Sequence, residues 1–140
     1  MAALTDEQIA AEDRFMRGLP RFNLAAFLIA PIWGPAHGFW ITILYYPAWV
    51  LLDNVIYTAI WEPSPLSIIV AILSAALMIG VSVIFSLTAQ PMAAHRAEDK
   101  GVSREDYLRR QRIWAVVSVV VAVIMVALAT WYNVAFRPFS

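Results

Sequence analysis

The sequence contains no cysteine, which excludes disulfide bonds, thiolate metal sites and cysteine nucleophiles. Charged residues are scarce as well: they make up 14% of the chain, against roughly a quarter of an ordinary soluble domain. The formal net charge is zero, so the overall charge does not favour nucleic acid as a partner. These shortages exclude a soluble globular core, and we expect no nucleic-acid partner.

Groups that could carry catalysis or hold a cofactor are also few. His37 and His95 are the only histidines, and neither has acidic residues around it at metal-ligand spacing. The five glycines are scattered singly, so the sequence has no glycine-rich phosphate loop. Neither a carboxylate pair nor a Ser/His/Asp arrangement can be assembled in one layer. We therefore predict that the protein is not an enzyme and binds no metal and no cofactor.

Hydrophobic residues, by contrast, make up 61% of the chain, and residues 22–52, 63–95 and 113–136 contain no charged residue. A helix needs about 20 residues to cross ~30 Å of hydrocarbon. Residues 66–89 and 113–132 reach this length, and residues 38–61 reach it although they include Pro47. The sequence thus predicts an all-α integral membrane protein, one domain over residues 1–140, with three transmembrane helices.

Residues 5–17 predict a short amphipathic helix before the first span. Thr5 and Gln8 have the spacing of a capping box, and Gly18 followed by Pro20 is typical of a helix end. The apolar positions of this segment share one side and the rest is charged. We expect the helix to lie on the membrane surface or on a partner.

Residues 22–36 are apolar but hold Pro31, Gly34 and Pro35 close together, which leaves about nine unbroken residues. That length is too short to cross a membrane. The segment is therefore predicted to be broken at these residues and either re-entrant, lining a cavity or docking a partner, or interfacial. The interfacial interpretation is favoured, because amphipathic lead-in segments are common. Several side chains would anchor it there: Phe22, Phe27, Ile32 and Trp33.

Basic residues accumulate in short cytoplasmic segments of membrane proteins. If residues 22–36 do not cross, nine of the ten basic residues fall on one side, and Arg137 is the exception. This asymmetry predicts a cytoplasmic N-terminus and an external C-terminus.

Most of these basic residues lie in one segment, residues 96–112, and form a predicted basic cytoplasmic face: Arg96, Lys100, Arg104, Arg109, Arg110 and Arg112. Ser103 followed by Glu105 and Asp106 predicts a helix start, and this helix runs directly into the third span. The charge serves to set the topology, or it contacts anionic lipid headgroups or a cytoplasmic partner.

The block around the broken segment resembles a known family. It reads FNLAAF at residues 22–27, which includes Asn23, then PIW at 31–33 and HGFW from His37 to Trp40. This order is similar to the signature of small bacterial inner-membrane proteins that share a domain of unknown function and read F-N-x-A-A-F, then G-P-x-W. Here Ala30 replaces the usual glycine, and His37 stands where a basic residue is common. The resemblance implies a small protein of the bacterial inner membrane and no particular activity.

Asp53 is the most unusual residue of the predicted first span. It lies ~12 Å of helix from Trp61 and ~20 Å from Trp40, and a bare carboxylate at that depth costs about 3 kcal/mol. The sequence predicts no Lys, Arg or His at the same depth. Asp53 belongs to a polar and aromatic stripe that we expect to face protein: Thr42, Tyr46, Trp49, Asp53 and Tyr57.

Two interpretations of Asp53 are open. It is either a protonatable site on a proton, ion or substrate path, or a hydrogen-bonded residue that holds helices together through Asn54, Thr58 or serines of the second span. The second span also carries small residues at spacings that let helices approach closely, among them Ala76 and Gly80.

The sequence predicts an accessory or structural subunit of a larger membrane complex, whose partners are the lipid bilayer and other membrane subunits or a second copy. Two alternatives are a transporter or channel component that uses Asp53, and an anchor that recruits a cytoplasmic partner through residues 96–112.

Overall fold

The computed structural model describes residues 3–137, so the end of the predicted external tail, residues 138–140, lies outside the described residues. The elements follow one another as α1 (Asp6–Met16), α2 (Leu24–Leu28), α3 (Ala30–Ala36), the 3₁₀ helix η1 (Trp40–Leu44), α4 (Tyr45–Trp61), α5 (Pro65–Asp99) and α6 (Arg104–Ala135). The described part of the chain contains no strand. The predicted all-α fold class is confirmed.

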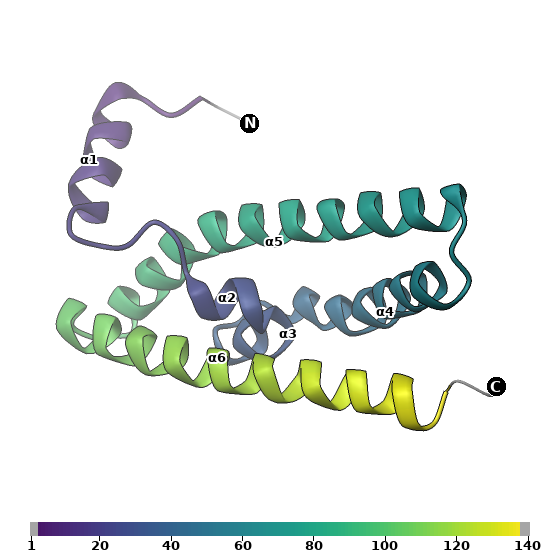
Figure 1. Ribbon diagram of the computed structural model, residues 1–140. Helices are drawn as coiled ribbons and strands as arrows, with labels where there is room; N and C mark the ends of the chain where they lie inside the picture. The colour runs from purple at the N-terminus through teal and green to yellow at the C-terminus, as the bar shows by residue number, and fades with distance from the viewer. Residues whose placement is uncertain (1–2, 138–140) are drawn as a thin grey trace.

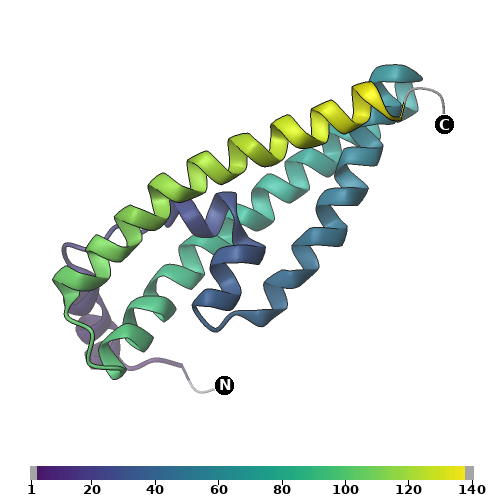
Figure 2. The ribbon, with the colours of Figure 1, turned by 90° about the horizontal axis from the view of Figure 1, so that it is seen from below.

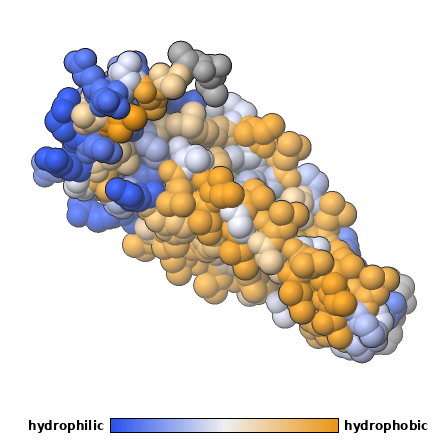
Figure 3. All heavy atoms as spheres, turned by 90° about the horizontal axis from the view of Figure 1, so that it is seen from above, coloured by the Kyte–Doolittle hydropathy of each residue, from blue (hydrophilic) through white to orange (hydrophobic). Residues whose placement is uncertain are grey.

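Three stretches are long and apolar enough to cross a membrane: Trp40–Trp61, Pro65–Asp99 and Arg104–Ala135. They run side by side, with α1 at one end of the bundle and the C-terminal end of α6 at the other (Figures 1 and 2). Hydrophilic residues gather at the end that carries α1, whereas hydrophobic residues cover most of the shaft (Figure 3). We call the end with α1, residues 90–99 and residues 104–112 the polar end, and the opposite end the far end.

Local hydrogen bonds account for where the helices begin. Thr5 and Gln8 form the predicted capping box of α1, and Ser64 forms a second one with Ser67 at the start of α5. The Ser103 hydroxyl accepts a hydrogen bond from the Asp106 N–H at 3.1 Å, so the predicted helix start before the third span is confirmed. These caps depend on neighbouring residues, which is why the sequence reveals them.

The second and third long helices extend beyond their predicted spans. With 35 and 32 residues, α5 and α6 are each about 50 Å long, well above the ~30 Å of a hydrocarbon layer. The second span is predicted to end near residue 89, and the helix itself continues past Pro91 to Asp99. It changes direction near its polar end (Figure 1), as expected where a proline removes a backbone donor.

The first span starts differently from its prediction at residue 38. It begins as the 3₁₀ helix Trp40–Leu44 and becomes α-helical at Tyr45. Pro47 lies in the first turn of α4 and does not interrupt it. A proline is tolerated there because an N–H in the first turn has no partner within the helix.

Residues 22–36 form two short helices: α2 lies between α5 and α6 (Figure 2), and α3 packs chiefly against η1. The break between them is at Ile29, which ends α2 and precedes α3. The predicted break at Pro31 to Pro35 is therefore wrong. Pro31 lies in the first turn of α3, where its missing N–H has no helical partner to lose, and Pro35 lies near its end.

The segment that holds the two short helices supplies half of the buried hydrophobic residues in the described part of the chain. Ala25, Ala26, Ile29, Ala30 and Trp33 are all 0% exposed. Opposite them lie three buried alanines of α5, Ala89, Ala93 and Ala94. Small side chains at this contact allow the backbones of α2 and α5 to approach closely. The interfacial interpretation is therefore wrong for the inner side of the segment, because Trp33 packs inside the protein and does not reach the lipid boundary.

We expect Gly34→Ala to lower the stability of the protein. A Cβ at Gly34 would lie 2.0 Å from Thr42 Oγ1 and 2.8 Å from Thr42 Cβ, and overpacking of this kind costs about 1–3 kcal/mol. The matched control is Gly80→Ala in α5, where a Cβ meets nothing within 4 Å; this change should stabilise by up to about 1 kcal/mol through helix propensity. Thermal unfolding in detergent measures both changes, and equal midpoints for the two variants would contradict the packing at Gly34.

Candidate functional site

Polar side chains from several helices form hydrogen bonds around one buried residue, Asn23, which is the N-cap of α2. The Asn23 N–H donates to Ser86 Oγ at 2.7 Å, and the Ser86 hydroxyl donates back to the Asn23 carbonyl at 2.7 Å. Both residues are buried. A buried serine of α5 thus satisfies both backbone groups of the residue that starts α2, which joins the two helices directly.

The Asn23 side chain extends this junction to α6. Its Nδ2 donates to Gln90 Oε1 at 2.8 Å and to Gln111 Oε1 at 2.9 Å, while its Oδ1 accepts from the Ala26 N–H at 3.0 Å. One carboxamide therefore caps α2 and connects it to α5 and α6. Unsatisfied amides are costly away from water, so the full set of partners explains why this residue is tolerated in the core.

Gln111 passes the network on to α3. Its Oε1 also accepts from Trp33 Nε1 at 3.0 Å, and because an indole N–H can only donate, this contact fixes the orientation of the Gln111 amide. Its Nε2 then points to His37 Nε2 at 3.0 Å, and His37 Nδ1 lies 2.8 Å from the Trp33 carbonyl. His37 must accept at Nε2 and donate at Nδ1, which is the pattern of a neutral imidazole.

The surroundings of His37 favour the same neutral form. Burial lowers the pKa of His37 below its ordinary value of 6.5, the hydrogen bond to the Trp33 carbonyl partly opposes that shift, and the positive charge of Lys100 lowers the pKa further. The Trp33 indole stacks on the imidazole with ring centroids 4.1 Å apart. A protonated His37 would lose the hydrogen bond from Gln111, so this side chain serves the packing of α3 in its uncharged state.

Further contacts complete the network on its outer side. Tyr107 Oη donates to Gln90 Oε1 at 2.8 Å, and Gln90 Nε2 donates to the Pro20 carbonyl at 3.0 Å. We call the set of side chains joined in this way the Asn23 network: Asn23, Trp33, His37, Ser86, Gln90, Tyr107 and Gln111. It is uncharged, and its hydrogen bonds connect α2, α3, α5 and α6.

The basic face is only partly where it was predicted. Two of its residues bond to backbone carbonyls of other elements. Arg96 donates to the His37 carbonyl at 2.9 Å and lies 4.4 Å from the centre of the Phe39 ring. Arg104 donates to the carbonyls of Phe15 and Arg17. A carbonyl left over at a helix end is a good acceptor for arginine. Arg96 is half-buried and turned to the protein, whereas Arg104 is exposed although it bonds to the backbone of α1 and of the segment after it. The others remain exposed: Lys100, Arg109, Arg110 and Arg112.

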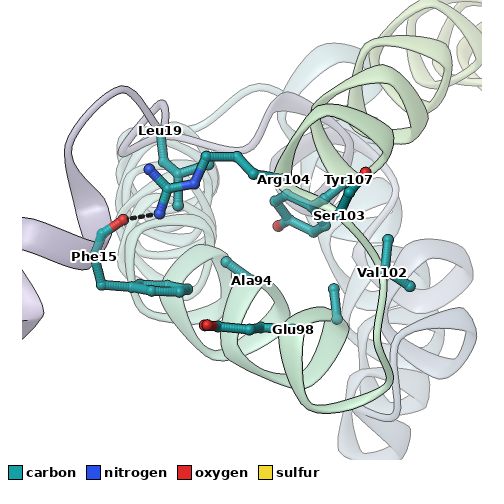
Figure 4. A pocket seen from close by; sticks show the side chains of 9 residues that line it. Phe15, Leu19, Ala94, Glu98, Val102, Ser103, Arg104 and Tyr107 are labelled. Carbon is teal, nitrogen blue, oxygen red and sulfur yellow. Dashed lines mark hydrogen bonds between the residues drawn. The ribbon is translucent and has the colours of Figure 1, made fainter.

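A pocket of about 280 Å³ lies beneath α1 at the polar end (Figure 4). Phe15, Glu98, Arg104 and Tyr107 line it. Two of its polar side chains have partners, since Arg104 reaches across to the Phe15 carbonyl and Tyr107 belongs to the Asn23 network. The same contacts, together with the Glu12 to His95 pair at 2.7 Å, attach α1 to α5 and α6.

Asp53 lies in a separate cluster at the far end. Asn133 Nδ2 donates to Asp53 Oδ1 at 2.6 Å, and Arg137 Nη1 lies 3.4 Å from Asp53 Oδ2. The guanidinium carbon of Arg137 also lies 3.9 Å from the centre of the Tyr57 ring. Although the sequence predicts no Lys, Arg or His at the depth of Asp53, Arg137, which follows α6, reaches it and supplies a basic partner. The predicted partners were wrong: they come from α6, whereas the Thr58 hydroxyl donates to the Asn54 carbonyl within α4.

The predicted stripe along the first span does not face protein throughout. Thr42 is buried and its hydroxyl donates to the Phe39 carbonyl at 2.8 Å, but Tyr46 is exposed. Asp53 and Tyr57 are half-buried, towards α6. The regular spacing assumed a single α-helix, and the 3₁₀ start at Trp40–Leu44 rotates Thr42 relative to the rest.

Several residues of these clusters were not predicted, although the sequence holds a signal for some. On α5, polar residues recur every four residues along one buried face: Ser82, Ser86 and Gln90. On α6, a similar inward face has spacings of four and seven residues: Tyr107, Gln111 and Ser118. Polar residues at helical spacing inside apolar stretches indicate a common partner. Asn133, at the far end of α6, and Arg137, just beyond it, are also four residues apart.

No group of three or more histidine, aspartate or glutamate side chains suited to a metal ion occurs among residues 3–137. No family model, no curated protein and no solved structure matches this chain. The resemblance of residues 22–40 to a family of bacterial inner-membrane proteins therefore stays a prediction.

We expect His37 to make the stability of the protein depend on pH. A lowered pKa means that the unfolded chain binds a proton before the folded protein does. The contribution of His37 is therefore complete above its ordinary pKa of 6.5 and is lost as the pH falls from there through the lowered value. His37→Gln removes this titration and keeps one donor and one acceptor.

Thermal unfolding in detergent from about pH 7.5 to about pH 5 measures the effect. The midpoint of the wild type should fall more steeply below pH 6.5 than that of His37→Gln. The two proteins differ at residue 37 alone, so the difference between their profiles reports on His37. Parallel pH profiles would show that His37 is not held neutral in the folded protein.

Proposed function

We propose that this protein is a small integral membrane subunit that supports a larger membrane assembly, formed with other subunits or with further copies, and carries out no chemistry of its own. One observation carries the proposal: the long helices scarcely cover one another. In the most apolar 18 residues of each range, no residue is buried within Trp40–Trp61, and 6% are buried within Pro65–Asp99 and within Arg104–Ala135. Such faces are covered by lipid tails or by other transmembrane helices.

The Asn23 network supports a structural role. Its side chains bond to one another and to the backbone, and they tie the two short helices to α5 and α6. A network whose members are satisfied makes the packing rigid. A subunit that presents surfaces to its neighbours benefits from one rigid end, whereas a site that handles substrates needs polar groups that are available for them.

One face of α5 is suited to close approach by another helix. Ala76 and Gly80 lie one turn apart and are exposed, and a Cβ built on Gly80 meets nothing within 4 Å. Small residues at this spacing allow two helix backbones to come into contact in a membrane. The face is apolar on both sides of these residues, with Ile72, Leu77 and Ile84 exposed.

We expect Gly80→Leu to weaken association by tenfold or more, because a leucine side chain keeps the backbones apart; this corresponds to about 1.4 kcal/mol. Ala127→Leu, which introduces the same leucine at an exposed position of α6, is the control and should leave association unchanged. Native purification followed by mass spectrometry identifies the accompanying subunits, and sedimentation in detergent measures the assembly. A wild-type protein that is monomeric and free of other subunits in native membranes would contradict the proposal.

We also propose that the protein resides in the bacterial plasma membrane with its polar end in the cytoplasm. This orientation rests on the positive-inside rule. The nine basic residues other than Arg137 belong to α1, to the segment after it, to the end of α5 and to the start of α6, all of which lie at the polar end (Figure 1).

A second candidate function is that of a transporter or channel component that uses Asp53. The observation that favours it is the ion pair between Asp53 and Arg137, whose side chains are 37% and 21% exposed. An ionisable pair on a membrane-spanning helix is a common feature of ion and proton pathways.

Asp53→Asn separates the two functions, because it removes the charge and keeps the shape of the side chain. Under the structural proposal, we expect weaker attachment of α4 to α6, with a lower thermal midpoint and weaker assembly, and no change in ion flux. Glu62→Gln is the matched control, since it makes the same change at an exposed position after α4. Intact assembly together with lost proton or ion flux in reconstituted vesicles would favour the transport function.

A further inference from the structure

Three arginines lie near the start of α6, where the helix enters its uncharged stretch. Arg109, Arg110 and Arg112 are all exposed, and residues 113–136 after them contain no charged residue. From Ile113 to Tyr132 a helix rises about 30 Å, which is the thickness of the hydrocarbon layer. Arg112 therefore lies at the boundary where lipid tails end and lipid headgroups begin.

Two of these arginines share the outward side of α6. Tyr107 and Ser118 mark the buried side of this helix. Successive residues of a helix are about 100° apart, so Arg109 points away from the buried side and Arg112 lies about 60° from Arg109. Residues three apart have Cβ atoms roughly 5–6 Å from each other, which lets both guanidinium groups reach one small anion. Arg110 lies on another side of the helix, about 160° from Arg112.

The protein does not balance the charge of Arg112. Its side chain forms no ion pair and no hydrogen bond with the described residues. The positions three and four residues before and after it on α6 hold no acidic residue, and one of them holds Arg109. Like charges at neighbouring positions of a helix repel each other. An anion bound between Arg109 and Arg112 would remove this repulsion.

The acidic residues near Arg109 leave it able to bind such an anion. Arg109 Nη2 lies 3.1 Å from Asp106 Oδ1, but the two side chains are 64% and 49% exposed, so water weakens this pair. Glu105 and Asp106 both lie about one turn farther from the apolar stretch. A guanidinium has five N–H donors, so Arg109 can contact Asp106 and a second acceptor at the same time.

The surface that continues from the arginines is apolar, and it indicates the kind of anion. Ile113, Val116 and Val120 follow on the same outward side and are 58%, 68% and 54% exposed. A ligand that contacts the whole of this surface has a negative group next to long apolar chains. The phosphodiester of a lipid meets both conditions. A lipid with a net negative charge fits best, because a zwitterionic headgroup carries an ammonium that opposes the arginines.

We propose that Arg109 and Arg112 bind the phosphodiester of an anionic membrane lipid, whose acyl chains lie along Ile113 and Val116. Both guanidinium groups donate to the phosphate oxygens, and their planar arrangement of donors suits this contact. The two arginines thus select a lipid at the start of α6, in addition to any influence on the topology of the chain.

The test uses the full chain, purified and delipidated in detergent, with lipid binding measured by native mass spectrometry. The probe is dioleoyl phosphatidylglycerol, and dioleoyl phosphatidylcholine has the same acyl chains without a net charge. We expect the wild type to bind the first lipid about tenfold more tightly than the second. Arg109→Gln and Arg112→Gln should each weaken phosphatidylglycerol binding by about threefold to tenfold and leave phosphatidylcholine binding unchanged.

Arg110→Gln is the control, because it removes the same charge from an exposed position on another side of the same helix. It should bind phosphatidylglycerol as the wild type does. Equal affinity of the wild type for the two lipids overturns the proposal. Equal weakening by Arg110→Gln and Arg112→Gln also overturns it, since this indicates attraction to the overall charge and not to a site. Excess inorganic phosphate should not displace the lipid, and displacement would show that the arginines bind a free anion instead.

Discussion

The carboxamide of Asn23 is the contact on which the rest of the fold depends. It caps α2, donates to Gln90 of α5 and donates to Gln111 of α6, and the backbone of the same residue is bonded to Ser86. Apolar side chains of the two short helices are about as stable against lipid tails as against protein, so the hydrophobic effect alone does not keep these helices in the bundle. Directional hydrogen bonds, which lipid tails cannot provide, hold this segment inside.

The position of α2 and α3 makes the two ends of the molecule different. At the polar end α2 fills the space between α5 and α6 with α3 packed beside it, and most of the buried residues are found there. Towards the far end nothing comparable lies between the long helices, whose apolar stretches are hardly buried. The Asp53, Asn133 and Arg137 contacts join α4 to α6 at this end. The exposed faces of the long helices follow from this uneven filling.

Polar residues serve the same purpose at both ends. The Asn23 network is neutral and buried, and His37 takes part in it as an acceptor, which requires its uncharged form. The far cluster pairs a carboxylate with a guanidinium, so neither charge faces hydrocarbon alone. In each case groups from distant parts of the sequence satisfy one another, and the hydrogen bonds decide which helices become neighbours.

The sequence by itself determined the all-α class, the approximate spans and the starts of α1, α5 and α6, because hydropathy, length and helix caps depend on residues close together in the chain. Only the tertiary structure decided that residues 22–36 lie inside the bundle, that Arg137 reaches Asp53 and that Arg96 and Arg104 bond to carbonyls of other elements. The spacing of Ser86 and Gln90 indicates a shared polar face, but not which partner meets it. That partner, Asn23, is more than sixty residues away in the chain, and no local pattern encodes a contact over such a distance.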